Sequence, residues 1–141
     1  KRVKPAKDRS VAFRKTRRHH VDETAEDYCE LIADLIKVKG EARTCTIAEH
    51  LGISHVTAVK TLGRLQSAGY VTTSRHKPVE LTEKGKKIAK YSKDRHQLLV
   101  DFLMRIGVPQ HVAEIDVEGA EHHLSKVTLK HIKHFLKEGD L

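Results

Sequence analysis

The spacing of apolar residues predicts a mainly helical chain. From Glu23 onward, apolar side chains recur every three or four residues, which is the period of one face of an α-helix, until Gly40 interrupts the pattern. A short amphipathic segment that ends at Gly52 and a second one that Ser54 can cap follow. Two helices joined by a tight glycine turn are typical of a helix-turn-helix. The pattern predicts that the buried face of the second of these helices consists of Val56, Val59, Leu62 and Leu65.

The period changes after Gly69. Residues 70–74 and 79–81 alternate apolar and polar side chains around a basic tip at residues 75–78, which predicts a β-hairpin, the wing of a winged helix. Thr82 can cap a long helix that ends near Gly107, and shorter helices are expected around residues 110–119 and 125–137. We therefore expect a mainly α fold, with an N-terminal winged helix-turn-helix that has a small β-hairpin wing and a C-terminal all-helical domain. The expected divisions are a disordered basic arm at residues 1–20, a winged-helix DNA-binding domain at 21–92 and a helical metal-binding and dimerisation domain at 93–141.

The distribution of charge indicates a polyanionic partner. The net charge is +8, and residues 1–20 alone hold nine Lys/Arg against one Asp, so that the remainder of the chain is neutral overall. Within that remainder, residues 37–95 hold 13 Lys/Arg against five Asp/Glu, and acidic residues collect on either side. A basic segment of this kind favours nucleic acid. The N-terminal arm is either a solvated tail or an additional source of phosphate contacts.

The remaining composition argues against a membrane or secreted protein. No stretch approaches the roughly 20 apolar residues that a membrane span needs, and no secretory signal opens the sequence, so a cytoplasmic protein is expected. Cys29 and Cys45 lack a close spacing and are expected to be reduced and packed in the core. With 38% hydrophobic residues and no tryptophan, the core of a monomer would be thin, which favours association with a second copy.

The second helix of a helix-turn-helix enters the major groove, where the residues at its start reach base edges. The side chains that we expect to be exposed there are Ser54, His55, Thr57, Ala58, Lys60 and Thr61. The residues expected to contact phosphates are Arg43, Arg64, Arg75 and Lys77. A helix-turn-helix can also serve only as a packing unit, but the basic hairpin beside it favours DNA binding.

Three groups of acidic residues and histidines could hold a metal ion. Asp27 and Glu30 are three residues apart on the first helix, and His96 lies in the long helix. Glu118, Glu121 and His122 have the spacing of one helical face. Taken singly, each residue is more simply explained as polar surface or as a satisfied core group. The second histidine of a zinc-hydrolase helix is missing, so neither an enzyme nor a small-molecule substrate is expected.

Several of these segments together resemble the manganese-responsive, MntR-type branch of the diphtheria toxin repressor (DtxR) family. The segments that carry the resemblance are residues 26–32, the helix-turn-helix up to Leu65, residues 95–99, residues 102–103 with 106–108, and residues 116–125. The resemblance extends over about residues 23–137, and residues 116–125 together with the pair Arg95-His96 are its specific part.

The resemblance implies a metal-dependent repressor of manganese-uptake genes that binds a double-stranded DNA operator as a homodimer. It also implies two Mn(II) ions per subunit, bound between the domains so that the dimer is fixed for operator binding. The implied ligands are Asp27, Glu30, His96, Glu118, Glu121 and His122. Four carboxylates and two imidazoles are a hard, oxygen-rich set that suits Mn(II) better than thiophilic metals. Iron-responsive relatives place sulfur ligands at the positions of Asp27 and Glu118 and continue into an SH3-like domain, which also favours the manganese branch.

Other interpretations stay open at this stage. The same scaffold could sense Fe(II) or Zn(II), or a winged-helix regulator could sense an organic ligand instead of a metal. A small metallohydrolase is a third alternative. Chelation would leave DNA binding unchanged in the organic-ligand case, and metal-dependent phosphoester turnover would indicate the hydrolase.

Overall fold

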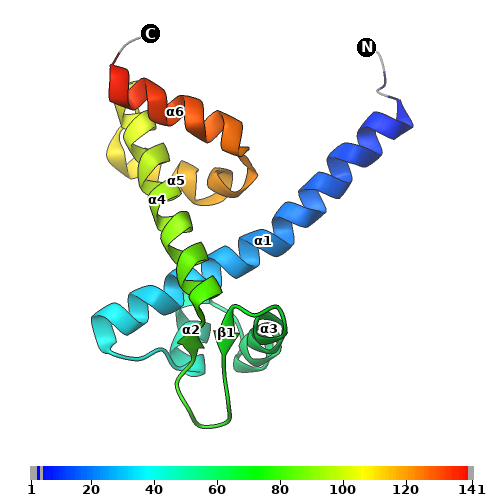
Figure 1. Cartoon of the computed structure of the whole chain (residues 1–141), viewed down its shortest axis with the longest axis vertical. Coiled ribbons are helices and arrows are strands. Elements are labelled where there is room, and N and C mark those ends of the chain that lie inside the picture. Colours follow the sequence, from blue (N-terminus) through cyan, green and yellow to red (C-terminus); the bar gives the residue numbers. More distant parts are fainter. Residues whose placement is uncertain (1–2, 4, 140–141) are drawn as a thin grey trace. The chain divides into compact units, whose positions relative to one another are not determined.

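The computed structural model describes residue 3 and residues 5–139, without the side chains of residues 12, 13 and 15–22. Its elements, in order, are α1 (Ala6–Lys39), α2 (Thr44–Leu51), α3 (His55–Ser67), β1 (Val71–Thr72), β2 (Glu80–Leu81), α4 (Glu83–Arg105), α5 (Gln110–Ala120), the 3₁₀ turn η1 (Glu121–His123) and α6 (Lys126–Glu138) (Figure 1). The chain forms two compact units. One is Thr24–Lys93, and the other combines Lys1–Glu23 with Asp94–Leu141.

The unit Thr24–Lys93 is a winged helix-turn-helix. Figure 1 shows α2, α3 and the hairpin lying together beside the C-terminal part of α1. Gly52, in the left-handed region with a φ of 65°, makes the turn between α2 and α3. The Ser54 hydroxyl then caps α3 by accepting a hydrogen bond from the Thr57 amide at 3.1 Å. The core of the unit is formed by side chains that are almost fully buried, among them Ile32, Ile47, Leu62, Val71 and Val79.

The predicted wing is confirmed as a short antiparallel hairpin. Val71 pairs with Leu81 and Thr72 with Glu80. The segment between α1 and α2 is tied to the same hairpin, because the Val79 amide donates to the Ala42 carbonyl at 2.7 Å. The chain then enters α4 directly.

The second unit contains the helices that the sequence predicts for the C-terminal domain. The last turns of α4 pack with α5 and α6 around a second apolar cluster formed by Leu99, Val100, Ala113, Val117 and Leu129. The Ser125 hydroxyl caps α6 by accepting a hydrogen bond from the Thr128 amide at 3.2 Å. These helices are buried on one face only, and α6 is strongly amphipathic.

The N-terminal segment differs from the expectation. The sequence predicted a disordered arm at residues 1–20, whereas α1 begins at Ala6 and runs without a break to Lys39. Residues 6–20 contain neither glycine nor proline and are rich in lysine and arginine, which are good helix formers. Continuation of an already stable helix also avoids the cost of a new nucleus. Residues 1, 2 and 4 of the expected arm lie outside the described residues.

The two cysteines have different environments. Cys29 is fully buried, as expected, but Cys45 is exposed on α2, so the expectation that both pack in the core is wrong for Cys45. Both thiols are free. Within the part of the chain that the structure describes, no helix combines the length and the apolar character needed to cross a bilayer.

Candidate functional site

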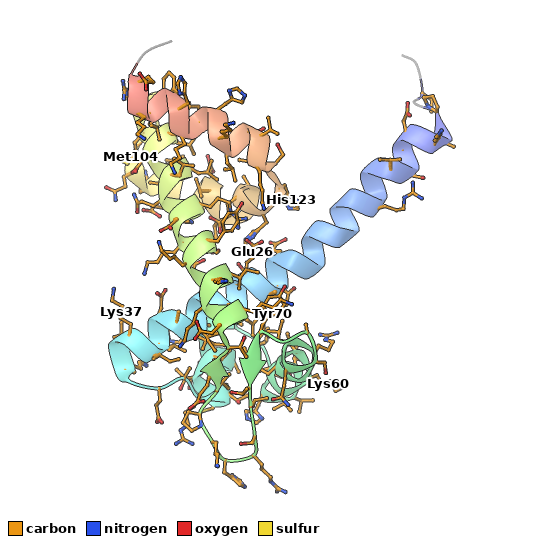
Figure 2. The ribbon with its side chains drawn as sticks, viewed as in Figure 1. Glu26, Lys37, Lys60, Tyr70, Met104 and His123 are labelled. Carbon is orange, nitrogen blue, oxygen red and sulfur yellow. The ribbon has the colours of Figure 1, made fainter. Side chains whose placement is uncertain are left out.

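The outward face of α3 differs in part from the face that the sequence predicted. Ser54, His55, Thr57, Lys60 and Arg64 are exposed as expected, and Lys60 projects outward from the helix (Figure 2). Ala58 and Thr61, in contrast, are only 0% and 5% exposed, so the expectation that they are exposed on this face is wrong. In their place, Val56 and Val59 are 63% and 50% exposed.

The rotation of the helix explains this correction. The residues expected to be buried were spaced by three, and three residues cover about 300° of a helix. Each successive member of the series is therefore displaced around the helix by roughly 60°. Val56 and Leu65 are nine residues apart, which is about two and a half turns, so they lie on opposite sides of α3. The structure instead buries Ala58, Leu62 and Leu65 along one side. The valines therefore belong to the outward face.

A basic concave surface lies between the start of α2, the outward face of α3 and the hairpin. It has a volume of about 620 Å³ and is lined by Arg43, Thr44, Cys45, His55, Val59, Gly63 and the loop residues 73–77. Three predicted phosphate-contacting residues, Arg43, Arg75 and Lys77, line it together. The Arg43 guanidinium donates to the His76 carbonyl at 3.2 Å, which connects the start of α2 to the wing. Concave, basic and flanked by an exposed helix, this surface has the features of a DNA-binding surface.

The second unit gathers imidazoles and carboxylates near the end of α5. His96 of α4 lies between two of them: its Nδ1 is 2.9 Å from Glu121 Oε2, and its Nε2 is 2.8 Å from Glu114 Oε2. The other oxygen of Glu121, Oε1, is 3.5 Å from Nε2 of His122. The Arg95 guanidinium donates to Nδ1 of His122 at 3.1 Å. Glu121 is only 2% exposed, and His122 is buried as well.

The electrostatics of this cluster reflect a carboxylate held away from water. Burial raises the pKa of the Glu121 carboxyl, against the opposing effects of His96, His122 and Arg95. Partial burial lowers the pKa of His96, but the hydrogen bond to Glu114 and the charges of Glu121 and Glu118 outweigh it, so that the His96 pKa is raised overall. The carboxylates around His96 therefore favour positive charge at this position.

The known proteins that the chain resembles agree with this arrangement. A family model described as "Iron dependent repressor, N-terminal DNA binding domain" matches residues 20–79, and one described as "Iron dependent repressor, metal binding and dimerisation domain" matches residues 82–140. The transcriptional regulator MntR of Salmonella typhimurium is 44% identical over 117 residues, which are 83% of this chain and 74% of that protein. The chain belongs to the iron-dependent repressor family. The predicted resemblance to MntR-type regulators of this family is thereby confirmed.

Further relatives of this repressor family extend the comparison. MntR of Escherichia coli O6:H1 is 41% identical over 126 residues, with 89% of this chain and 81% of that protein covered. A solved "Manganese-dependent transcriptional repressor complex with manganese" is 29% identical with a TM-score of 0.72, over 80% of this chain and 52% of that one. The manganese regulator SloR has the same fold, with a TM-score of 0.69 at 24% identity over 80% of this chain and 53% of that one. The chain spans about half the length of these two solved structures. The matched relatives are regulators of transcription and not enzymes.

The resemblance to MntR-type regulators implied six metal ligands, and the structure gives their surroundings. His96, Glu121 and His122 form one cluster, and Glu118 is exposed on α5. The expectation that residues 118, 121 and 122 share one helical face is wrong in detail, because α5 ends at Ala120 and the 3₁₀ turn η1 carries the last two. In the unit Thr24–Lys93, Asp27 is half-buried on α1, and Glu30 accepts a hydrogen bond from the buried Ser92 hydroxyl at 2.7 Å.

Two residues of this repressor's cluster were missed in the sequence. Glu114 lies four residues before Glu118 and seven before Glu121, so its position on the same side of α5 could have been noticed. Arg95 lies directly before His96, and nothing in its spacing indicated that it would contact His122. On the outward face of α3, the exposure of Val56 and Val59 was missed because they were assigned to the core.

The residues present fit a divalent cation by their chemistry. The cluster offers carboxylate oxygens and imidazole nitrogens without a thiolate, which is the donor set of a hard or borderline divalent metal. The buried Glu121 carboxylate is the strongest observation, since a buried negative charge needs a cation or a proton beside it. Cys29 is fully buried in the other unit, and burial raises the pKa of its thiol to about 12.

Proposed function

We propose that this chain is an Mn(II)-activated transcriptional repressor that acts in the cytoplasm, as a homodimer, on a double-stranded DNA operator of manganese-uptake genes. The observation that carries the proposal is the buried Glu121 carboxylate between the imidazoles of His96 and His122. This cluster belongs to a chain whose other unit presents a basic winged helix. A sensor of a divalent metal that controls DNA binding needs both of these features.

The proposed metal is Mn(II), with two ions per subunit. The proposed ligands are Asp27, Glu30, His96, Glu118, Glu121 and His122. A donor set of carboxylates and imidazoles suits Mn(II), although Zn(II) would bind the same atoms tightly, so selectivity has to come from coordination number and geometry. The relatives that carry the name MntR, and the solved repressor that contains manganese, support this choice.

The residues of the chain explain why DNA affinity would depend on the metal. Bound Mn(II) would supply positive charge that offsets the repulsion among the carboxylates. Glu121 is held at its position by His96 and His122, and the carboxylate keeps this position only with positive charge beside it. Metal and DNA then increase each other's affinity by the same factor, commonly about 5- to 150-fold.

At the DNA-binding surface we propose a division between base and phosphate contacts. His55, Thr57 and Lys60 of α3 would contact base edges, because they are exposed at the start of that helix. The basic residues Arg43, Arg64, Arg75 and Lys77 would contact phosphates and fix the position of α3 in the groove. Ser54 caps the helix and presents its end to the DNA backbone.

A homodimer is supported by apolar side chains that the second unit leaves exposed. Met104 and Ile106 at the end of α4, Ile115 of α5 and Val127 of α6 are all exposed. Association with a partner would remove these exposed apolar side chains from water. A second copy of the chain is the proposed occupant, in agreement with the dimerisation domain that the family model describes.

The deciding experiment measures DNA capture with and without metal. Sheared genomic DNA from the source organism would be incubated with the purified protein at about 0.15 M salt, which weakens purely electrostatic binding. Captured fragments with Mn(II) would be compared with those in a chelator, and their affinities measured by fluorescence anisotropy. We expect Mn(II) to enrich a few discrete fragments. Equal capture in both conditions would contradict the proposal and favour a regulator that senses an organic ligand.

Variants connect this result to the proposed ligands. His96→Ala and Glu118→Ala should lose the metal dependence of DNA binding and remain dimeric. The matched control is His134→Ala, which removes an exposed histidine of α6 outside the proposed ligand set. If His96→Ala and His134→Ala respond equally to Mn(II), the ligand assignment is wrong. Activation by Fe(II) or Zn(II) but not by Mn(II) would change the identity of the metal and keep the sensor.

A further inference from the structure

The His96 ring has a carboxylate on each side. Nδ1 is 2.9 Å from Glu121 Oε2 and Nε2 is 2.8 Å from Glu114 Oε2, and all three residues belong to the same compact unit. A neutral imidazole carries one proton and one lone pair, so only one of its nitrogens can bind a metal, and the other must carry the hydrogen. When His96 binds a metal, the two carboxylates therefore cannot have the same role.

The surroundings of the two carboxylates differ. Glu121 is buried beside His122, so Nδ1 of His96 points toward the other proposed ligands of its unit. Glu114 is on the opposite edge of the ring, with a side chain that is 44% exposed, and Nε2 points toward it. Nδ1 is consequently the nitrogen that can bind a metal held by Glu121 and His122, and Nε2 is the nitrogen that must donate its hydrogen.

We propose that Glu114 is a positioning residue, which accepts the Nε2 hydrogen of His96 and so keeps Nδ1 unprotonated and oriented for the metal. This inference rests on the proposed function, because it assumes that His96 is a metal ligand. A carboxylate that accepts a hydrogen bond from a metal-binding histidine fixes the tautomer and the ring orientation, and its removal commonly reduces metal affinity by about 10- to 100-fold.

The contact between Glu114 and His96 differs from an ion pair between two fully exposed side chains. A side chain on α5 contacts the ring of a residue on α4, and the His96 side chain is only 19% exposed. Glu114 is not placed as a metal ligand itself, because its oxygen lies at the nitrogen that faces away from Glu121. Its role is to act through His96.

The test combines a binding measurement with a spectroscopic one. Mn(II) affinity would be measured by electron paramagnetic resonance for the wild type, Glu114→Ala, Glu114→Gln and Asp116→Ala. Asp116 is an exposed carboxylate of the same helix, so its removal makes the same change in net charge. The His96 tautomer would be read from long-range ¹H–¹⁵N correlation spectra of the protein loaded with Cd(II), a diamagnetic divalent ion.

We expect the Cd(II)-loaded wild type to carry its hydrogen on Nε2 of His96. Glu114→Ala should bind Mn(II) about 10- to 100-fold more weakly and lose the fixed tautomer. Glu114→Gln retains an oxygen that accepts the same hydrogen, so its loss should be smaller and its tautomer unchanged. Asp116→Ala should resemble the wild type.

Three results separate the inference from the proposed function. A wild type with its hydrogen on Nδ1 in the Cd(II) form would overturn the role of Glu114, even if a variant failed to fold. Equal Mn(II) affinity of Glu114→Ala and Asp116→Ala would overturn it as well, while leaving the metal sensor intact. A wild type that binds neither Mn(II) nor Cd(II) would overturn both the inference and the proposed function.

Discussion

The junction between the wing and α4 depends on the absence of a side chain at Gly85. A Cβ atom there would overlap the Tyr70 carbonyl oxygen and would lie 3.1 Å from Cδ2 of Leu81 and 3.2 Å from the Tyr70 carbonyl carbon. Because the obstacle is backbone and not the end of a flexible side chain, Gly85→Ala forces the start of α4 away from the chain that leads into β1. We expect this substitution to destabilise the whole unit.

The magnitude follows from the hydrogen bonds at the junction. The Thr82 amide donates to the Tyr70 carbonyl at 3.0 Å. The Thr82 hydroxyl has a single hydrogen, which it can donate to the Gly69 carbonyl at 2.6 Å or to the Tyr70 carbonyl at 3.0 Å. Separating the two segments weakens these two bonds, at about 1 kcal/mol each. Alanine recovers about 1 kcal/mol because it is the better helix former. The net expectation is a loss of about 1 kcal/mol in the free energy of unfolding.

Urea unfolding at a fixed protomer concentration measures this loss, since the stability of a dimer depends on concentration. The matched control is Gly63→Ala, at an exposed position of α3 where an added Cβ meets nothing within 4 Å. This control should be stabilised by about 0.5–1 kcal/mol. If Gly85→Ala were as stable as Gly63→Ala, the close approach of α4 to Tyr70 would not exist in solution, and the reasoning would be refuted.

Three further predictions concern the thiols, the recognition helix and the N-terminal segment. In the native protein, iodoacetamide should modify the exposed Cys45 and spare Cys29, because burial raises the pKa of the Cys29 thiol to about 12. Mass spectrometry should find one adduct per chain, and two adducts in the native state would contradict the structure. Val59→Glu should weaken operator binding at least about tenfold without changing the urea midpoint, because an exposed side chain is altered on the DNA-facing side of α3; unchanged anisotropy titrations would exclude this face. Replacing the lysines and arginines of residues 1–20 by glutamine should flatten the plot of log affinity against log salt by about 0.9 for each phosphate that the segment neutralises, and an unchanged slope would leave the segment as a solvated tail.

The elements that depend on local chemistry were predictable from the sequence. The hydroxyls of Ser54, Thr82 and Ser125 each cap the helix that was expected to follow them, and Gly52 makes the expected turn. The change from a helical to an alternating pattern after Gly69 identified the wing. A cap or a turn needs only a few neighbouring residues, so its signal is contained in a short segment.

Features that depend on helix rotation or on distant contacts were not predictable in this way. The series from Val56 to Leu65, spaced by three residues, runs from one face of the helix to the opposite face. Only the packed core shows that Ala58 is buried and Val59 exposed. The contact between Glu114 and His96 joins two helices, so no local pattern indicates it. The helical start at Ala6 was missed because residues 1–20 lack the apolar periodicity that indicates a helix.

Arg43 can contact a phosphate without giving up its hydrogen bonds to the wing and to Glu41. A guanidinium has five N–H groups. Arg43 uses its Nε and one N–H of Nη2 toward the Glu41 carboxylate, at 3.2 and 3.4 Å, and one N–H of Nη1 toward the His76 carbonyl. One N–H on each terminal nitrogen is left for a phosphate, so Arg43 can take a phosphate while it still holds the wing and Glu41. Its side chain is immobilised before DNA arrives, which reduces the entropy lost on binding. A lysine at this position, with three donors on a single nitrogen, could not hold a carboxylate, a carbonyl and a phosphate in this planar arrangement.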